Sequence, residues 1–288
     1  MKKHYTSLII AMAALLTACA PGADYSTLEV DGNSSAIING TKVTSRTNDG
    51  SRGVVLFLPV NGVGMAMGIC TATLISDRSV LTAAHCFDKS SKTIAGFKII
   101  FADHKGIATR DAYKREGRKE DVIIHENFRK SKIGLLNDVA VAFFDGGIPE
   151  GFEPVEIERD KTINYQNSTL NIYGYGKKRD SREIFAIGHG SAGDLRKAVV
   201  KLNGSYGLMQ DRYQIMSKGN TQFICSGDSG SGQFVKVNGK PRVIGVTSFV
   251  TGVKDVFGHV PCTEGRSTAM KVAYFADWID EVHSKYNQ

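Results

Sequence analysis

The chain is 288 residues long, with 42% hydrophobic and 23% charged residues. This composition excludes a disordered or fibrous protein, and the length is enough for one two-part domain or two small ones. The formal net charge of +7 is modest, and no basic run interleaved with aromatic residues indicates nucleic-acid binding.

The N-terminus has the pattern of an export signal. Two lysines precede the apolar run 8–16, which is too short to cross a bilayer. The run leads into Leu16-Thr17-Ala18-Cys19, which resembles a bacterial lipobox ending in a lipidated cysteine. We therefore expect residues 1–18 to be a lipoprotein signal peptide; a plain signal peptide with an unrelated cysteine is the alternative. By resemblance to lipoproteins, Ala20 favours the outer membrane.

Residues 19–36 are small and polar without periodicity, which predicts a flexible tether or propeptide. If Cys19 carries lipid, an even set of cysteines remains, and in an exported protein this indicates two disulfides with three possible connectivities. Metal binding is the alternative, but neither a CxxC pair nor a tight His/Cys cluster supports it, and we expect no metal and no cofactor. The four remaining cysteines are Cys70, Cys86, Cys225 and Cys262.

Ordered structure is expected from Ile37, and β signals dominate thereafter. Short apolar or alternating runs are separated by turns rich in Gly, Asp and Asn, and the 31 glycines also suit a β-rich fold. The C-terminus alone is typical of a helix, because Val272, Phe275, Ile279 and Val282 fall at helical spacing. The expected strands are 54–60, 69–75, 79–82, 98–102, 122–125, 139–144, 169–173, 197–202, 222–225, 233–237 and 243–249.

The run 225–232, Cys-Ser-Gly-Asp-Ser-Gly-Ser-Gly, places Ser229 among glycines beside an acid. Glycine lets backbone N–H groups approach a ligand closely, so this serine has the surroundings of a nucleophile that attacks a carbonyl. A Gly/Ser surface turn is the alternative. A serine nucleophile needs a general base and an orienting acid. His85 follows one predicted strand and Asp138 precedes another, although either residue taken alone also fits a structural role.

Together these segments resemble the trypsin/chymotrypsin family of serine proteases. The resemblance covers residues 37 to about 280, in the family's order. It rests on Ile37-Ile38-Asn39-Gly40 (the family's new N-terminus), Thr82-Ala83-Ala84-His85-Cys86 (the histidine block), Asp138 (the acid block), Tyr173-Gly174-Tyr175-Gly176, Cys225 to Gly230 (the nucleophile block), Gly245 to Phe249, and Lys271-Val272 with Trp278-Ile279.

The resemblance implies an all-β, chymotrypsin-like fold: two packed antiparallel six-stranded Greek-key β-barrels with a C-terminal helix. The first barrel is expected at 37–155, with His85 and Asp138, and the second at 156–288, with Ser229 and the helix. The chain order of these three residues disfavours an α/β-hydrolase, which runs serine, acid, histidine.

The resemblance also implies a role for each site residue. Ser229 is the expected nucleophile, His85 the general base and Asp138 the acid that orients the histidine. Ser248 is expected to hydrogen-bond this aspartate, and the N–H groups of Gly227 and Ser229 to form the oxyanion hole. The implied disulfides are Cys70–Cys86 and Cys225–Cys262.

In this family the aspartate at Asp228 pairs with the α-amino group freed at the position of Ile37. Because a buried aspartate without a cation costs about 3–5 kcal/mol, we expect a zymogen that is activated by cleavage at Ala36–Ile37. The cut would also release the catalytic part from lipidated Cys19. Ala36 is not the basic residue common in family zymogens, which disfavours a trypsin-like activator.

By the same resemblance, Phe223 lies at the base of the substrate pocket, where it supplies no charge for a basic P1 side chain. Val250 is expected to narrow the pocket, as in elastase-like members, with Ser267 opposite. The predicted preference is for small or medium apolar P1 residues, which would include Ala36 and permit self-processing. The segment 251–261 is longer than is usual in the family.

The expected function is therefore a serine endopeptidase that acts on proteins or peptides through an acyl-enzyme. We expect a monomer without nucleic acid, tethered through Cys19 as an outer-membrane lipoprotein and periplasmic or extracellular after release. A non-catalytic homologue that binds a partner is the alternative, disfavoured because the triad is complete. A structural envelope lipoprotein would explain Cys19 but not the triad.

Overall fold

The computed structural model describes residues 37–87, 93–103, 113–131, 134–178, 193–204, 213–216, 221–255 and 260–286. The predicted signal peptide, Cys19 and the tether lie outside these residues. Within the described ranges the structure is mostly β, with the α-helix α1 (Val272–Tyr286) near the C-terminus. No helix in these ranges has the length and apolar character that crossing a membrane requires.

The first sheet contains seven antiparallel strands. Its edge strands β6 and β7 are separated in the chain only by the three-residue 3-10 turn η6 (Lys119–Asp121), so the sheet curls until its edges meet. With β6 and β7 counted as one bent strand, the sheet is a six-stranded barrel. The order is β6 (Lys114–Arg118), β5 (Ile94–Ile100), β2 (Val54–Asn61), β3 (Cys70–Ser76), β4 (Ser79–Thr82), β10 (Ala140–Phe143) and β7 (Val122–Ile124).

The second sheet closes through its own hydrogen bonds, because β14 pairs with both β17 and β13. The closed ring is β12 (Thr169–Gly174), β15 (Gly232–Val237), β16 (Lys240–Thr251), β17 (Arg266–Lys271), β14 (Tyr213–Met216) and β13 (Arg196–Gly204). Two short strands attach to this ring: β1 (Thr41–Lys42) on β13, and β11 (Glu156–Ile157), which is parallel to β16. A separate hairpin is formed by β8 (Arg129–Ser131) and β9 (Gly134–Leu136).

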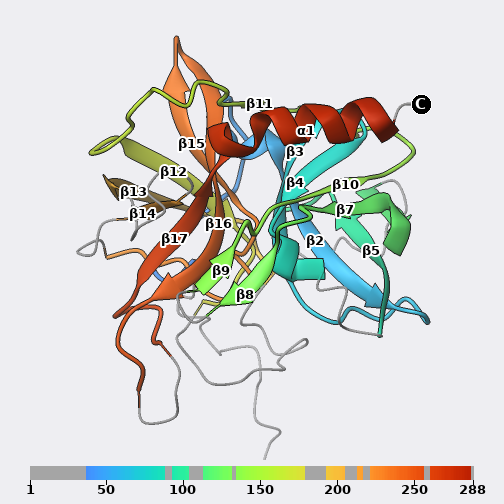
Figure 1. The fold of residues 1–288 in the computed structure, drawn as a ribbon, viewed down its shortest axis with the longest axis horizontal. Coiled ribbons are helices and arrows are strands. Elements are labelled where there is room, and N and C mark those ends of the chain that lie inside the picture. The colour runs from blue at the N-terminus through green and yellow to red at the C-terminus, as the bar shows by residue number, and fades with distance from the viewer. Residues whose placement is uncertain are drawn as a thin grey trace, which may run out of the picture. The chain divides into compact units, whose positions relative to one another are not determined.

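The strands of the two sheets gather on opposite sides of Figure 1, with α1 lying across both. From α1, Phe275 and Trp278 contact the ring of His125, which follows β7, with centroids 5.3 and 4.9 Å apart. Tyr286 stacks on Phe143 of β10 at 3.7 Å. The expected fold class, a chymotrypsin-like pair of β-barrels with a C-terminal helix, is confirmed.

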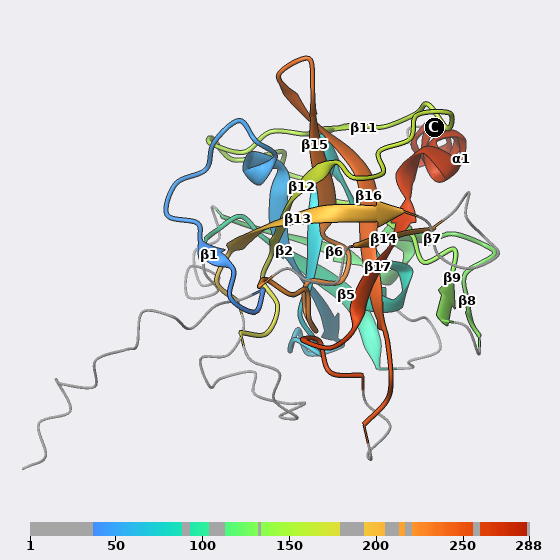
Figure 2. The ribbon, with the colours of Figure 1, turned by 90° about the vertical axis from the view of Figure 1, so that its left-hand side faces the viewer.

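The N-terminal segment of the described chain belongs with the second sheet. Ile37 is fully buried in the apolar cluster that contains Leu170 and Ile172. Ile38 forms an isolated bridge with Phe223, and β1 then pairs with β13 (Figure 2). The division expected from the sequence placed residue 37 onward in the first barrel. In the structure the backbone partners of residues 38–43 are Phe223, Leu195 and β13, all from the part of the chain expected to form the second barrel.

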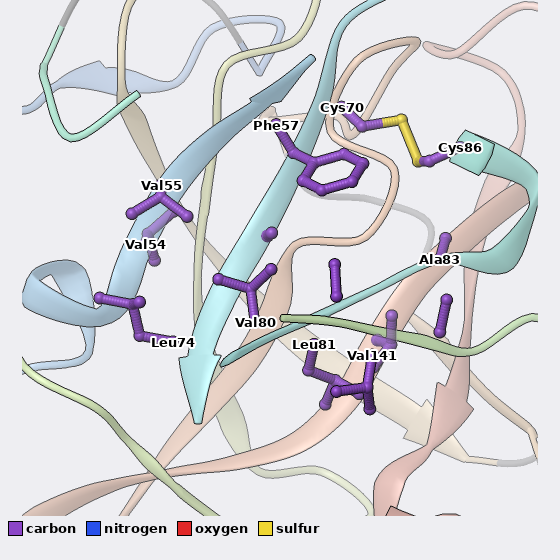
Figure 3. Close-up of a cluster of buried hydrophobic side chains, with 14 of the residues drawn as sticks. Val54, Val55, Phe57, Cys70, Leu74, Val80, Leu81, Ala83, Cys86 and Val141 are labelled. Atoms are coloured by element: carbon purple, nitrogen blue, oxygen red, sulfur yellow. A yellow bond between two sulfur atoms is a disulfide. The ribbon is translucent and has the colours of Figure 1, made fainter. Parts of the chain in front are cut away.

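The core of the first barrel leads directly to the candidate site. Figure 3 shows side chains of β2, β3, β4 and β10 packed together, with the disulfide between Cys70 and Cys86 at one end of the cluster. Every residue of β4 is buried, which fixes the point from which the next turn starts.

Candidate active site

His85 lies on a short turn at the end of a buried strand. β4 ends at Thr82, and the 3-10 turn η3 (Ala84–Phe87) carries the histidine. Cys86, on the same turn, forms a disulfide with Cys70 at the start of β3. The turn is therefore held by the core on one side and by a covalent bond on the other. The His85 side chain remains 25% exposed, so a substrate can reach it.

Asp138 lies between β9 and β10, and it is fully buried. Its Oδ2 is 2.6 Å from His85 Nδ1, and its Oδ1 accepts the backbone N–H of His85 at 2.7 Å. The hydroxyl of Ser248, on β16, also donates to Oδ2. Three donors thus satisfy a carboxylate that burial would otherwise destabilise. Because the carboxylate accepts, Nδ1 carries the proton and Nε2 is the basic nitrogen.

The Ser229 turn packs against the residues that lead into the histidine turn. Gly230 has a left-handed φ of 84°. A Cβ atom at this position would lie 2.1 Å from Thr82 Oγ1 and 2.9 Å from the nitrogen of Ala83. Only glycine allows such a close approach, and it brings the segment that carries Ser229 against the start of η3.

The carbonyl of Ser229 is fixed by the first sheet. It accepts the N–H of Thr71 at 2.8 Å. It also lies 3.8 Å from Cys86 Sγ, which carries no proton because that sulfur is in the disulfide. In the described part of the chain, no hydrogen bond joins the Ser229 hydroxyl to His85. Catalytic hydrogen bonds are often long in the absence of substrate and shorten in the reacting complex.

The turn around Ser229 leaves two backbone N–H groups unpaired. The N–H groups of Asp228, Gly230 and Ser231 donate to backbone carbonyls at 3.0, 2.7 and 3.0 Å. Those of Gly227 and Ser229 have no acceptor among the described residues, and Gly227 has a left-handed φ of 100°. Two free N–H groups beside a serine hydroxyl have the arrangement that a developing oxyanion would require.

Asp228 is fully buried. Burial raises the pKa of its carboxyl group to about 7, against the opposing effect of hydrogen bonds from the N–H groups of Cys225 and Gly176, each 2.9 Å long. A Cβ at Gly174 would lie 2.0 Å from Asp228 Oδ1, and one at Gly176 would lie 2.6 Å from it. No side-chain cation in the described ranges forms an ion pair with this carboxylate.

Ile37 does not pair with Asp228 in the uncut chain, because its nitrogen is a peptide amide and no hydrogen bond joins the two among the described residues. The Ile37 side chain is fully buried. Its φ of 50° is left-handed, which is costly for a β-branched residue. The backbone beside the Ala36–Ile37 bond is thus held in an unfavourable conformation.

A cavity of about 180 Å³ opens beside Ser229. Val250 and Ser267 line this cavity, at positions where the sequence predicted pocket walls. Phe223 does not line it, and Ile224 does. The backbone of Phe223 exchanges both hydrogen bonds with Ile38, which keeps this residue with the N-terminal segment. The lining residues are Ile224, Cys225, Ser226, Ser229, Thr247, Ser248, Phe249, Val250, Val260, Cys262 and Ser267.

The second disulfide joins Cys225 to Cys262, 37 residues later, and both cysteines line the cavity. The two pairings are those that the family resemblance implied. Cys70, His85 and Cys86 lie close enough together to suggest a metal site, but both sulfurs are held in a disulfide and provide no thiolate ligand.

The two barrels, the buried acid that holds a histidine and the neighbouring serine turn define a chymotrypsin-like protein. The Trypsin family matches residues 42–279. Chymotrypsin-like elastase family member 1 of Canis lupus familiaris is 23% identical over 223 residues, 74% of this chain and 80% of the relative. Brachyurin of Leptuca pugilator is 26% identical over 220 residues, 74% and 87% of the two chains. Urokinase-type plasminogen activator of Gallus gallus is 25% identical over 240 residues, 76% and 52% of the two chains.

The chain belongs to the trypsin family of serine proteases. Sequence reasoning missed three residues that the structure brings to the site: Thr71, Ile224 and Val260. Val260 lies in the segment noted above as long for the family, which was the one available signal. Thr71 was assigned only to a strand, and nothing in its sequence neighbourhood indicates a contact with the serine turn.

Proposed function

We propose that the chain is an active serine endopeptidase that cleaves proteins or peptides through an acyl-enzyme. One observation carries the proposal: a buried Asp138 holds the Nδ1–H of His85 beside the turn of Ser229. The two unpaired N–H groups on that turn add the donors that an acyl-transfer reaction needs.

Each site residue has one step in this reaction. Ser229 Oγ attacks the carbonyl carbon of the scissile bond while His85 Nε2 takes the hydroxyl proton. The N–H groups of Gly227 and Ser229 stabilise the negative oxygen of the tetrahedral intermediate. His85 then gives the proton to the leaving amine, the C–N bond breaks and an acyl-serine remains. Water attacks this ester with His85 again as base, releasing the acid and restoring the Ser229 hydroxyl.

Labelling with a fluorophosphonate probe tests the proposal. The chain with Ile37 as its first residue should label and should cleave a denatured protein substrate, and both activities should vanish in Ser229→Ala. Ser45→Ala is the control: this serine is also exposed but lies outside the residues that line the cavity, and the variant should still label. A wild-type chain that neither labels nor cleaves would favour the non-catalytic, partner-binding alternative.

The second part of the proposal is zymogen activation at Ala36–Ile37. The buried carboxyl of Asp228, with its raised pKa, and the unfavourable φ of Ile37 support it. Cleavage would create an ammonium group at Ile37 that can neutralise the buried carboxylate. N-terminal sequencing of active enzyme should begin at Ile37. Active enzyme that retains residues 20–36 would contradict the idea, and normal maturation of Ser229→Ala would exclude self-processing.

The third part is lipid attachment at Cys19, supported by the sequence Leu16-Thr17-Ala18-Cys19. The uncut chain should then incorporate a fatty acid label and fractionate with the outer membrane, and Cys19→Ser should do neither. Cleavage at Ala36–Ile37 should release the catalytic part into the soluble fraction, since both disulfides lie downstream of the cut.

The fourth part is a preference for small or medium apolar P1 residues. The cavity of about 180 Å³ supports it, because none of the described residues that line the cavity is charged, and Ile224, Val250 and Val260 contribute apolar walls. Profiling on a peptide library should give Ala, Val or Leu at P1. Cleavage mainly after Lys, Arg or large aromatic P1 residues would contradict this part of the proposal and no other.

A further inference from the structure

One residue of the first sheet holds the two carbonyl groups that flank Asp228. Thr71, on β3, is fully buried. Its backbone N–H donates to the carbonyl of Ser229 at 2.8 Å, and its hydroxyl donates to the carbonyl of Gly227 at 3.0 Å. These carbonyls belong to the same two residues whose N–H groups have no acceptor in the described part of the chain.

The direction of these hydrogen bonds is determined by their partners. A carbonyl only accepts, so the Thr71 hydroxyl donates its proton to Gly227. The same oxygen accepts the backbone N–H of Tyr175 at 3.1 Å. The next residue, Gly176, donates its N–H to Asp228. Thr71 therefore joins the serine turn to the segment that surrounds the buried carboxylate.

Gly227 needs such a support. It has a φ of 100°, and glycine has more conformational freedom than any other residue, so its peptide planes rotate easily. The Thr71 hydroxyl fixes the peptide plane on the C-terminal side of Gly227 in a buried position, where the hydrogen bond is strong. This plane lies between the two peptide planes that carry the N–H groups of Gly227 and Ser229. A buried carbonyl that loses this partner gains by turning towards another donor.

We propose that Thr71 is a positioning residue that keeps the N–H groups of Gly227 and Ser229 aligned for the oxyanion. The inference rests on the proposed peptidase function and adds to it a residue outside the triad and outside the serine turn. The hydroxyl is the essential group, because the backbone N–H of residue 71 remains whatever its side chain.

The chain offers a matched control on the same strand. Thr73, two residues after Thr71, is also fully buried, and its hydroxyl oxygen accepts the N–H of Gly232 at 3.1 Å. Thr73→Val removes a buried threonine hydroxyl that bonds the segment after Ser229. It leaves Gly227 untouched, so it should lower stability without changing the oxyanion donors.

The test compares Thr71→Val, Thr71→Ser and Thr73→Val in the chain that starts at Ile37, with Ser229→Ala as the inactive reference. Removal of a whole oxyanion donor costs about 10²–10³ in kcat. We expect Thr71→Val, which misaligns donors rather than removing them, to lower kcat about 10- to 100-fold with KM changed less than about threefold. A peptide boronate, which forms a tetrahedral adduct on serine, should lose affinity by a similar factor.

Thr71→Ser should restore kcat to within about threefold of wild type, and Thr73→Val should leave kcat near wild type. If Thr71→Val does not fold, Thr71→Ala removes the same hydroxyl without a branched replacement and should show the same loss of kcat. Equal kcat in wild type and Thr71→Val, or an equal loss in Thr73→Val, overturns the inference while the peptidase function stands. A wild-type chain without peptidase activity overturns both.

Discussion

Replacing Asp228 by asparagine in the uncut chain should stabilise the protein at neutral pH. The carboxyl group is fully buried and has no cation partner among the described residues, and burial raises its pKa from 3.8 to about 7. Asparagine keeps the size of the side chain and never ionises, but its amide nitrogen cannot accept, so one of the N–H groups of Cys225 and Gly176 loses its acceptor at a cost of about 1–3 kcal/mol that does not depend on pH. The uncut variant therefore avoids the cost of a buried negative charge.

The size and sign of this effect follow from the pKa. A carboxyl group whose pKa is higher in the folded than in the unfolded state binds its proton more tightly when folded. Its favourable contribution is complete below pH 3.8 and is lost as the pH rises through about 7. At about 1.4 kcal/mol per pH unit over that interval, the loss is about 4 kcal/mol, and more than half of it falls between pH 5 and pH 8.

The assay is urea denaturation at several pH values from 5 to 8, in a chain that also carries Ser229→Ala to prevent self-cleavage. The difference in the free energy of unfolding between Asp228→Asn and its parent should grow by about 2–3 kcal/mol over this range. In the chain cut at Ala36–Ile37 the order should reverse, because the new ammonium then pairs with the carboxylate of Asp228.

Glu158→Gln is the control, since Glu158 is also buried but its pKa is shifted in the opposite direction. Burial raises the pKa of Glu158, but the opposing effects are larger, so the net shift is downward. These effects are hydrogen bonds from the Tyr165 hydroxyl and from the N–H groups of Asp160 and Arg159, together with the positive charge of Arg242. Its stabilising contribution is present above its unfolded pKa and is lost as the pH falls. Parallel stability curves for Asp228→Asn and its parent from pH 5 to pH 8 would refute the reasoning.

Three further predictions concern the site. Ser248→Ala removes a donor to buried Asp138 and should lower kcat about tenfold with little change in KM, as steady-state kinetics would show; an unchanged kcat would contradict this. Replacing Cys225 and Cys262 together by alanine should lower the free energy of unfolding by about 4 kcal/mol in denaturant titrations, and an unchanged midpoint counts against it. Val250→Gly should widen the cavity and shift the preferred P1 residue to larger side chains in library profiling. An unchanged P1 preference would show that Val250 does not limit the pocket.

Buried strands could be predicted from the sequence, because a buried strand consists mainly of apolar residues. The first strand of the first sheet, Val54–Asn61, is almost wholly buried, so its apolar run is visible in the sequence. β6, with Lys-Arg-Glu-Gly-Arg, is charged and partly exposed, and its strand conformation depends on pairing with β5. The predicted strand 222–225 is reduced to the bridge at Phe223, because the chain turns at once into the disulfide and the Asp228 turn. Strand conformation in such segments is set by neighbours more than by residue type.

Site residues that lie in short sequence motifs could be predicted from the sequence. Those whose place in the site depends on tertiary packing could not. The blocks around His85 and Ser229 stand out as short sequences. The residue at the base of the cavity was predicted by counting back from Ser229, but which of Phe223 and Ile224 lines the cavity depends on the backbone pairing with Ile38. The contact of Thr71 with the serine turn joins residues 156 positions apart, and only the packing of the barrels creates it.

Each sheet supplies a hydrogen-bond partner for a site residue that belongs to the other sheet. Asp138, from the first sheet, takes a hydrogen bond from Ser248 of the second. The serine turn leads into the second sheet and rests on Thr71 of the first. The site therefore depends on contact between the two barrels. A partly buried cation lies in this contact: Arg46 pairs with Asp103 at 2.8 Å and donates to the hydroxyl of Tyr175 at 3.0 Å. Because Tyr175 also donates its N–H to Thr71, contacts between the barrels reach the carbonyl of Gly227 through two consecutive hydrogen bonds. Alignment of the catalytic groups and stability of the interface between the barrels should accordingly rise and fall together.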